Sequence, residues 1–416
     1  MESILPLLQQ THAASLAVRR LSDAQKKAIL LQLADELWAH KDEIMAANRL
    51  DLDRMDDGNP MKDRLLLNEK RIENLATSVR DVANLPDPTG EVLLERQLQN
   101  GLLLRKVAVS LGVVGIIYES RPNVTVDVTA LCIRSGNAAV LRGGSDAWYS
   151  NSYLVGLIQQ VLEKQGINPA CVILLPTDRE LVKEMLTATR YIDIIIPRGS
   201  DKLIQFVRQN SLVPTIETGA GVVHTYVESS ADLIKARDIV VNARVSRPSV
   251  CNSLDSILVD AAIAVQFLPM LCQDFLKWNV EVFADETAYA ILEQAQYPLL
   301  QHAAPEDFGK EFLDYKISIK VVSGIAEALE HLRLYSSRHS EAIVSQNQAL
   351  INQFLEEVDA AAVYANASTR FTDGGEFGLG AEIGISTQKL HARGPFALEK
   401  LVTEKWIAIG DGQVRW

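Results

Sequence analysis

Short apolar runs alternate with helix-like segments through the middle of the chain, and this alternation limits the possible folds more than any other feature. The expected strands are 113–118, 138–141, 172–175 and 192–196, and the expected helices are 124–134, 147–165, 179–188 and 201–210. Such alternation predicts a parallel sheet with helices on both faces and ligand-binding loops at the carboxyl ends of its strands. The fold class is therefore α/β, with a Rossmann-type parallel-sheet domain.

A second alternating region begins near residue 222. Its expected strands are 222–227, 257–259 and 319–322, and its expected helices are 231–242, 262–277 and 325–334. We interpret it as a smaller α/β domain, because a chain of 416 residues is too long for one ordinary core. The expected division is a first domain over 1–229, a second over 230–365, and a C-terminal segment over 366–416.

Two extended runs, 91–98 and 102–109, flank a loop that contains Asn100 and Gly101. Asn-Gly between apolar-alternating segments predicts a β-hairpin in which both turn residues have positive φ. Because a two-stranded ribbon is seldom stable by itself, we expect the hairpin, at about 91–109, to protrude and pack on another subunit. Packing onto its own domain is the alternative.

Composition excludes several classes of protein. The net charge of −12 speaks against nonspecific nucleic-acid binding. The N-terminus shows no basic leader, and no apolar run approaches the roughly 20 residues needed to cross a bilayer. The four cysteines form no Cys-x-x-Cys and the seven histidines no His-x-x-x-His, which argues against a disulfide framework and against a metal site. These features predict a cytoplasmic protein without membrane, metal or nucleic-acid partners.

Cys251 lies in a polar stretch just ahead of the apolar run 257–259. Pro248 disfavours a helix here, so the thiol is expected at a chain reversal. Arg244 and Arg247 precede it, and a nearby cation favours the thiolate, which is the nucleophile. The cysteines in apolar runs, typical of buried thiols, are Cys132, Cys171 and Cys272. Cys251 is therefore the candidate nucleophile, and an exposed thiol without function is the alternative.

Two strand ends have the residues of an anion-binding turn. Residues 142–146 follow the expected strand 138–141, and residues 197–201 follow 192–196. In each turn, glycine lets the backbone approach a ligand, and a Ser or Asp cap opens a helix whose free N–H groups favour an anion. Two such turns, each with an arginine, predict a nucleotide site. Neither is a Gly-x-Gly-x-x-Gly fingerprint, so ordinary strand-to-helix loops are the alternative.

Three basic side chains alternate near the C-terminus. Lys389, His391 and Arg393 would face one side of the chain if the segment were extended. On an acidic protein this is a candidate anion site. A solvated edge strand with protective charges would have the same pattern.

Several longer stretches match one family. They are 115–127, 247–252, 322–343 with His331, His339 and Ser340, and 366–375 with 393–395. On these stretches, and over nearly the whole chain, the sequence resembles the gamma-glutamyl phosphate reductases, also called glutamate-5-semialdehyde dehydrogenases, a branch of the aldehyde dehydrogenase superfamily. The resemblance implies an aldehyde-dehydrogenase-like fold, in which 1–229 binds the cofactor, 230–365 is catalytic, and 366–416 returns to the cofactor domain and the oligomerisation region.

The resemblance also implies a reaction, the NADPH-dependent reduction of L-glutamyl 5-phosphate to L-glutamate 5-semialdehyde with release of phosphate, in proline biosynthesis. Cys251 would attack the acyl phosphate and form a thioester, which is then reduced. The implied donors to the developing oxyanion are the Asn123 side chain and the backbone N–H of Cys251. The implied partners are a second copy of the chain and glutamate 5-kinase.

The remaining site residues follow from the same resemblance. The cofactor-binding residues are Arg142, Gly143, Gly144, Ser145, Gly199, Ser200 and Glu311. Position 145 is a serine and not an acid, and an arginine without an acid there suits the 2′-phosphate of NADP, although Asp146 adjoins it. Gly199 and Ser200 resemble the pyrophosphate-contacting turn. Glu311 is expected at the nicotinamide ribose. As a hypothesis, the arginines that bind the substrate's anionic groups are Arg121, Arg247, Arg370 and Arg393.

Three other functions stay open. Glu217 occupies the stretch where hydrolytic aldehyde dehydrogenases have the base that activates water, so a hydrolytic dehydrogenase is the first alternative. In a reductase, Glu217 would be held away from the thioester or be structural. The second alternative is a cofactor-free cysteine hydrolase or acyltransferase that pairs Cys251 with His339 or His224. The third is a non-catalytic oligomeric binding protein.

Overall fold

The computed structural model describes residues 3–56 and 62–415, which divide into two compact units. Unit 1 extends to Thr218 and includes Gly378–Gly384 and the residues from Pro395 onward, and unit 2 comprises Gly219–Phe377 and Ile385–Gly394. The boundary expected between 229 and 230 falls inside unit 2, because β7 (His224–Val227) pairs with strands of the second sheet. The segment 366–416 is shared between the two units.

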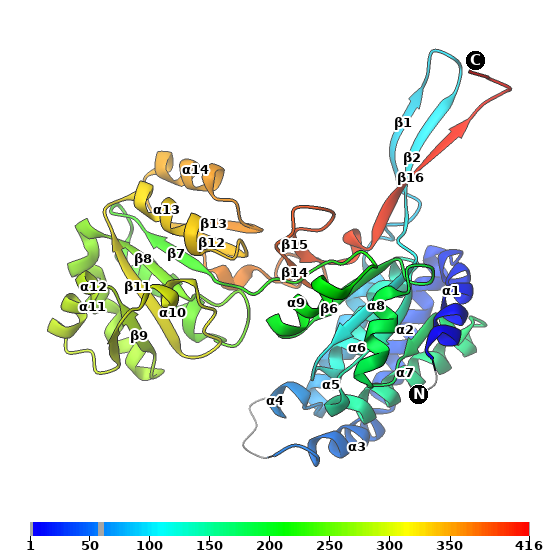
Figure 1. Cartoon of the computed structure of the whole chain (residues 1–416), viewed down its shortest axis with the longest axis horizontal. Helices are drawn as coiled ribbons and strands as arrows, with labels where there is room; N and C mark the ends of the chain where they lie inside the picture. The colour runs from blue at the N-terminus through cyan, green and yellow to red at the C-terminus, as the bar shows by residue number, and fades with distance from the viewer. Residues whose placement is uncertain (1–2, 57–61, 416) are drawn as a thin grey trace. The chain divides into compact units, whose positions relative to one another are not determined.

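Unit 1 contains a four-stranded parallel sheet in the order β5-β4-β3-β6, whose edge strand β6 is labelled in Figure 1. Its strands are β3 (Val113–Tyr118), β4 (Ala138–Arg142), β5 (Val172–Leu174) and β6 (Ile194–Arg198). Almost all their residues are buried, as in strands covered on both faces. The α/β prediction is confirmed. The chain moves outward from β3 to β5 and returns on the other side of β3, so the switch point lies between β3 and β6.

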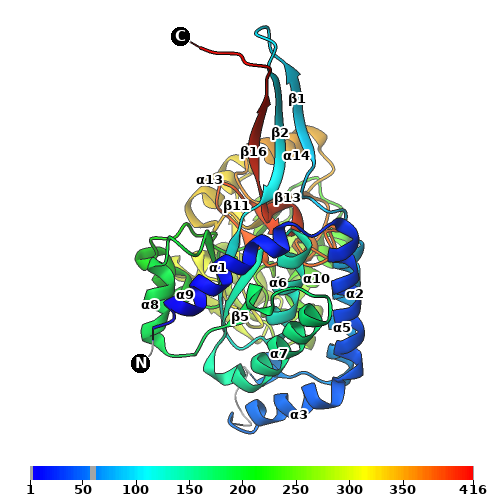
Figure 2. The same ribbon diagram turned by 90° about the vertical axis from the view of Figure 1, so that its right-hand side faces the viewer.

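The helices of unit 1 pack around this sheet (Figure 2). They are α1 (Leu5–Arg19), α2 (Asp23–Ala39), α3 (Lys41–Leu52), α4 (Lys62–Leu65), α5 (Glu69–Asn84), α6 (Pro122–Arg134), α7 (Trp148–Lys164), α8 (Arg179–Thr187) and α9 (Asp201–Asn210), with the 3-10 turns η1 (Ser145–Ala147), η2 (Pro169–Cys171) and η5 (Leu398–Lys400). Helix α1 packs on β3, β4 and β5, and α5 packs on α6. Helix α6 begins at Pro122, which suits a first helical position because the missing N–H has no intrahelical partner there.

The expected hairpin forms, with β1 (Val92–Gln97) and β2 (Leu103–Ser110) antiparallel. A third strand, β16 (Val402–Ile409), pairs with β2, so the ribbon becomes the three-stranded sheet β1-β2-β16 (Figures 1 and 2). The predicted turn is wrong: Asn100 does not have positive φ, and Gly101 does, at +85°. The Leu98 N–H donates to the Leu102 oxygen, which makes a three-residue loop closed by a left-handed glycine.

Unit 2 is built on a seven-stranded parallel sheet in the order β10-β9-β11-β8-β7-β12-β13 (Figure 1). Besides β7, its strands are β8 (Ser256–Asp260), β9 (Glu281–Ala284), β10 (Leu300–His302), β11 (Lys316–Val322), β12 (Ser340–Val344) and β13 (Ala362–Ala365). Its helices are α10 (Leu233–Val245), α11 (Ala261–Lys277), α12 (Glu286–Gln294), α13 (Ile325–Tyr335) and α14 (Gln348–Glu357), with η3 (Pro305–Gly309) and η4 (Thr369–Phe371). Two short strands complete the chain, β14 (Gly384–Ser386) and β15 (Gly394–Phe396). The sheet is larger than the three strands expected from the sequence.

Membrane spans and metal sites were sought among the described residues. None of their helices is long and apolar enough to span a bilayer. None of their histidine, cysteine, aspartate and glutamate side chains gather in a group of three or more suited to a metal ion.

Candidate active site

An open pocket of about 410 Å³ lies at the carboxyl ends of the sheet strands of unit 1. The lining residues follow all four strands; they are Glu119, Ser120, Arg142, Gly144, Ser145, Asp146, Thr177, Arg179 and Ser200. The pocket therefore flanks the switch point between β3 and β6, where open parallel sheets bind nucleotides. The structure brings together four of the predicted cofactor residues: Arg142, Gly144, Ser145 and Ser200.

The other two predicted glycines allow close packing beside the pocket. A Cβ at Gly143 would lie 2.3 Å from Nδ2 of Asn151, and one at Gly199 would lie 2.4 Å from Oε2 of Glu119. No side chain fits at either position without displacing its neighbour. The predicted need for glycine in these turns has this local physical reason.

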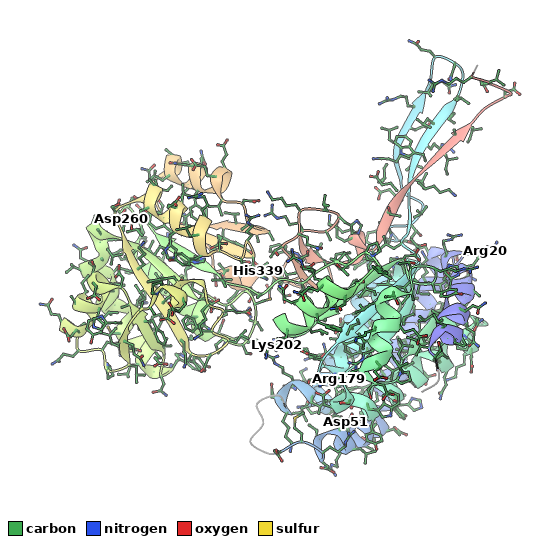
Figure 3. The ribbon with its side chains drawn as sticks, viewed as in Figure 1. Arg20, Asp51, Arg179, Lys202, Asp260 and His339 are labelled. Atoms are coloured by element: carbon green, nitrogen blue, oxygen red, sulfur yellow. The ribbon has the colours of Figure 1, made fainter. Side chains whose placement is uncertain are left out.

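Two arginines, Arg142 and Arg179, line the pocket together with the carboxylates of Glu119 and Asp146. The Nη2 of Arg142 donates to the Thr177 oxygen at 2.6 Å, and its Nε is buried with no hydrogen-bond partner among the described residues. Burial and the charge of Arg179 lower the pKa of Arg142. An unsatisfied buried donor beside a second guanidinium fits an anionic group such as the phosphates of a dinucleotide. Arg179 (Figure 3) was missed by the sequence reasoning, although its position after the strand near 172–175 was the available signal.

The start of α9 already binds a carboxylate. The Ser200 N–H donates to Oε2 of Glu119 at 2.7 Å, and the Ser200 hydroxyl donates to Oε1 at 3.1 Å. A helix N-terminus favours an anion, and here the anion is the protein's own Glu119. A pyrophosphate at this turn would have to replace that carboxylate.

Helix α6 holds the predicted oxyanion donor. Asn123 is exposed in its first turn, and Arg121 occupies the N-cap position before Pro122. The Asn123 Nδ2 donates to Oδ2 of Asp127 at 3.0 Å. Burial raises the pKa of Asp127 to about 6. Asp127 was not identified from the sequence.

In unit 2, Cys251 lies in the loop between α10 and β8 and is half-buried, as its polar surroundings predicted. A Cβ at Gly221 would lie 1.6 Å from the Cys251 carbonyl oxygen, so the two backbones are in direct contact. Oε1 of Glu311 accepts the Gly221 N–H at 3.0 Å. The thiol, Gly221 and Glu311 all precede strands of the second sheet, so this group lies at the amino ends of parallel strands.

The cation beside the thiol is Arg370. Burial and the charge of Arg247 lower the pKa of Arg370, whereas the charge of Cys251 opposes that shift. Arg370 bonds the Asn252 side chain and donates from Nε to the Ser246 hydroxyl at 3.1 Å. Arg370, one of the predicted substrate residues, thus lies near Cys251 and near a second one, Arg247.

Arg244 has a different role from the one expected. It is buried, pairs with Asp255 at 3.0 Å, and donates to the carbonyl oxygens of Leu254 and Pro248 at 2.7 and 2.9 Å. Its guanidinium therefore joins both ends of the loop that holds Cys251.

Arg393 is paired within unit 2. Arg393 and Lys389 each lie 2.7 Å from Asp359, and they lower the pKa of Asp359 to about 2. The extended segment that would align three basic side chains does not form, because His391 has a φ of +65° and residues 387–393 contain no strand.

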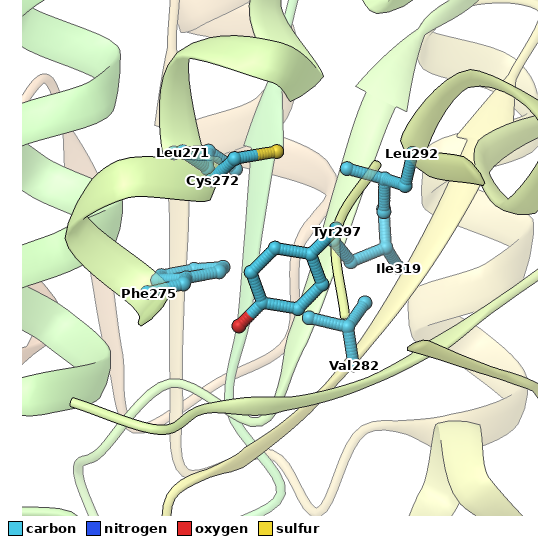
Figure 4. Close-up of a pocket in the computed structure, with 7 residues that line it drawn as sticks. All are labelled: Leu271, Cys272, Phe275, Val282, Leu292, Tyr297 and Ile319. Carbon is cyan, nitrogen blue, oxygen red and sulfur yellow. The ribbon is translucent and has the colours of Figure 1, made fainter. Parts of the chain in front are cut away.

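Cys132 and Cys171 are buried, as predicted, whereas Cys272 is partly exposed. Burial raises the pKa of Cys132 and Cys171 to about 12. Cys272 packs beside Leu271, Phe275 and Tyr297 in a contact too tight to hold a water molecule (Figure 4). All four cysteines are free of disulfides.

The histidines proposed for a cysteine hydrolase bind elsewhere. The His339 Nδ1 bonds the Ser340 hydroxyl at 2.8 Å, and the His224 Nδ1 lies 3.2 Å from Oε2 of Glu341. Nε2 of each ring is buried and has no partner among the described residues. Glu217, the proposed base of a hydrolytic enzyme, pairs with Arg208 at 3.7 Å in unit 1.

Comparison with known proteins gives the family of the chain. The aldehyde dehydrogenase family model matches residues 3–303. The gamma-glutamyl phosphate reductase of Chlorobaculum parvum is 54% identical, covering 100% of this chain and 99% of the relative. That of Parabacteroides distasonis is 52% identical, covering 99% and 100%.

Solved structures give the same grouping. The gamma-glutamyl phosphate reductase of Thermotoga maritima matches with a TM-score of 0.94 at 42% identity, covering 100% of both chains. An acetylating aldehyde dehydrogenase of Geobacillus thermoglucosidasius, 16% identical and covering 99% and 97%, shares the fold with a TM-score of 0.72. The chain therefore belongs to the gamma-glutamyl phosphate reductases, within the aldehyde dehydrogenase family.

Proposed function

We propose that the chain catalyses NADPH-dependent reduction of L-glutamyl 5-phosphate to L-glutamate 5-semialdehyde with release of phosphate, in proline biosynthesis. The observation on which this depends most is the half-buried Cys251 near the guanidinium of Arg370, which in turn lies near Arg247. Cations favour the thiolate and attract an acyl phosphate. Unit 1 is the proposed cofactor domain and unit 2 the proposed catalytic domain.

The chemistry begins at Cys251. Its thiolate forms a bond to the acyl carbon, the bond from that carbon to the phosphate oxygen breaks, and a thioester remains. Arg247 and Arg370 stabilise the charge of the leaving phosphate. The proposed donors to the oxyanion are the Asn123 side chain and the backbone N–H of Cys251. A nicotinamide, when bound, would supply the hydride that reduces the thioester. Cys251 would then leave as the thiolate when the carbon–sulfur bond breaks.

NADPH is the proposed cofactor because two arginines line the pocket of unit 1. Arg142 and Arg179, with Ser145, would hold the 2′-phosphate. Gly143, Gly144, Gly199 and Ser200 would allow the backbone to approach the rest of the dinucleotide, with the carboxylate of Glu119 giving way to its pyrophosphate. Glu311 is the proposed ligand of the nicotinamide ribose.

The proposed ligands of the substrate's anionic groups are Arg121, Arg247 and Arg370. The ion pair of Arg393 with Asp359 disfavours the same role for Arg393.

A phosphate-dependence assay tests the function. We expect glutamate semialdehyde to reduce NADP when phosphate or arsenate is present, and Cys251→Ser to lower turnover at least about a thousandfold. Full turnover without phosphate would favour a hydrolytic dehydrogenase that uses Glu217. Turnover without any nicotinamide would favour a cysteine hydrolase, and full function in Cys251→Ser would favour a non-catalytic protein.

A second copy of the chain is the proposed partner of the sheet β1-β2-β16. Its strands expose Val92 (51%), Leu93 (43%), Trp406 (54%) and Ile409 (48%), and such apolar exposure marks an interaction surface. Native mass spectrometry tests this, with Trp406→Glu expected to lower the oligomer mass.

Glutamate 5-kinase, as the source of an acyl phosphate, is a candidate second partner that co-purification tests. The disulfide-free cysteines support the proposed cytoplasmic location.

A further inference from the structure

Asn123 and Asp127 lie one turn apart on α6, and the amide of the first donates to the carboxylate of the second. An asparagine amide has two orientations of almost equal shape, one presenting N–H groups and the other presenting oxygen. An ionised carboxylate only accepts hydrogen bonds, so it selects the orientation with Nδ2 toward it. One of the two Nδ2 protons is then used, and the other remains for a ligand.

Asp127 is itself held by groups from two other elements. The Ser78 hydroxyl on α5 donates to Oδ1 of Asp127 at 3.3 Å, and Arg198 at the end of β6 favours the ionised carboxylate through its charge. An ordinary pair of side chains four residues apart on a helix adds only about 0.2–0.5 kcal/mol to its stability, and it forms without contacts from other elements.

Burial opposes the charge on Asp127, which raises the pKa of this group to about 6. Because the folded-state pKa of Asp127 is above the ordinary value, the stability of the fold falls as the pH rises from the ordinary pKa to the folded-state pKa, and it stays lower above that range. A carboxylate kept at a cost to stability beside an exposed amide is typical of a functional site.

We propose that Asp127 is a positioning residue, which holds the Asn123 amide so that its second Nδ2 proton is available to the oxyanion of the reaction. This inference rests on the proposed function, in which Asn123 is that donor. Protonated Asp127 can donate to the amide oxygen, which permits the flipped orientation. The flipped amide presents oxygen to the oxyanion and repels it.

The test compares Asp127→Asn with wild type in phosphate-dependent NADP reduction by glutamate semialdehyde. Removing one oxyanion donor costs about 10²–10³ in kcat, so losing its orientation is expected to lower kcat about tenfold or more at pH 8. The KM for the semialdehyde is expected to change less than about twofold, because the interaction belongs to the transition state. Asp81→Asn, an exposed carboxylate on α5, is the matched control and should match wild type.

The pH profile separates positioning from a structural role. The ratio of wild-type kcat to Asp127→Asn kcat is expected to fall toward one below pH 6, because protonated Asp127 and asparagine can both donate. Protonation of the nucleophile affects both enzymes and cancels in the ratio. A ratio near one at every pH from 5 to 8 would overturn the inference. So would a Tm of Asp127→Asn so low that the fraction of unfolded enzyme accounts for the whole loss of kcat.

A double-mutant cycle checks that Asp127 acts through Asn123. The variant Asn123→Ala with Asp127→Asn should be no slower than Asn123→Ala alone. Additive losses would overturn the inference. If Asn123→Ala keeps full kcat, both the inference and the oxyanion role of Asn123 fail, whereas phosphate-dependent turnover and its loss in Cys251→Ser still test the reductase function independently.

Discussion

The backbone of Gly221 is in direct contact with that of Cys251, and a Cβ at Gly221 would lie 1.6 Å from the Cys251 carbonyl oxygen. Backbone atoms cannot move aside as the end of a flexible side chain can. Gly221→Ala must therefore displace the loop that holds the nucleophile. We expect kcat to fall about a hundredfold, since a displacement of about 1 Å is enough for that loss.

The control for Gly221 is Gly156→Ala. A Cβ at Gly156 meets nothing within 4 Å, and alanine suits the interior of α7. Steady-state kinetics, with Tm measured alongside, compares the two variants. If Gly221→Ala folds and keeps kcat within about twofold, the contact does not position Cys251.

Arg370→Gln tests the cation beside the thiol. Removal of a positive charge disfavours the thiolate, so we expect Cys251 to react about tenfold more slowly with iodoacetamide at pH 7. Peptide mass spectrometry distinguishes Cys251 from the other three cysteines. Arg237→Gln, on the surface of α10, is the control and should react at the wild-type rate. An unchanged rate in Arg370→Gln would exclude this electrostatic role.

Arg179→Met tests the 2′-phosphate site. A hydrogen bond to a charged group is worth about 1.5–3 kcal/mol, so the KM for NADPH should rise about ten- to a hundredfold. The KM for NADH, which lacks the 2′-phosphate, should stay within about twofold. Arg190→Met replaces an exposed arginine outside the pocket and should leave both values unchanged. Equal rises for both cofactors would mean that Arg179 binds another part of the dinucleotide.

Asp359→Asn tests the pairing of Arg393 through the pH dependence of stability. The pKa of Asp359 is lowered to about 2 by Lys389 and Arg393. A carboxyl group whose folded-state pKa is depressed stabilises the fold fully above its unfolded pKa, about 3.9, and loses that contribution as pH falls toward 2.

The free energy of unfolding should therefore fall by less than about 1 kcal/mol in Asp359→Asn at pH 7, because partly exposed ion pairs contribute little. The difference from wild type should shrink between pH 4 and pH 2. Urea unfolding at several pH values measures it, and a difference that stays constant down to pH 2 would contradict the pairing.

The sequence by itself determined the elements whose signals are local. Buried strands such as β3 are continuous apolar runs, so the parallel α/β fold was predictable from them. Cys251 stood out because its neighbours are polar and include Pro248, whereas the other cysteines lie in apolar runs. The hairpin was predictable from its alternating strands, but its loop geometry was not, because two turn types accept the same Asn-Gly pair.

Only the tertiary structure decided which distant residues meet. Arg370 lies more than a hundred residues after Cys251, and Arg179 joins Arg142 only because β5 pairs with β4. The same holds for β16, which completes the hairpin from the other end of the chain. Periodicity indicates which face of an element is apolar. It contains no information on which elements become neighbours or on which carboxylate will form an ion pair with a given arginine.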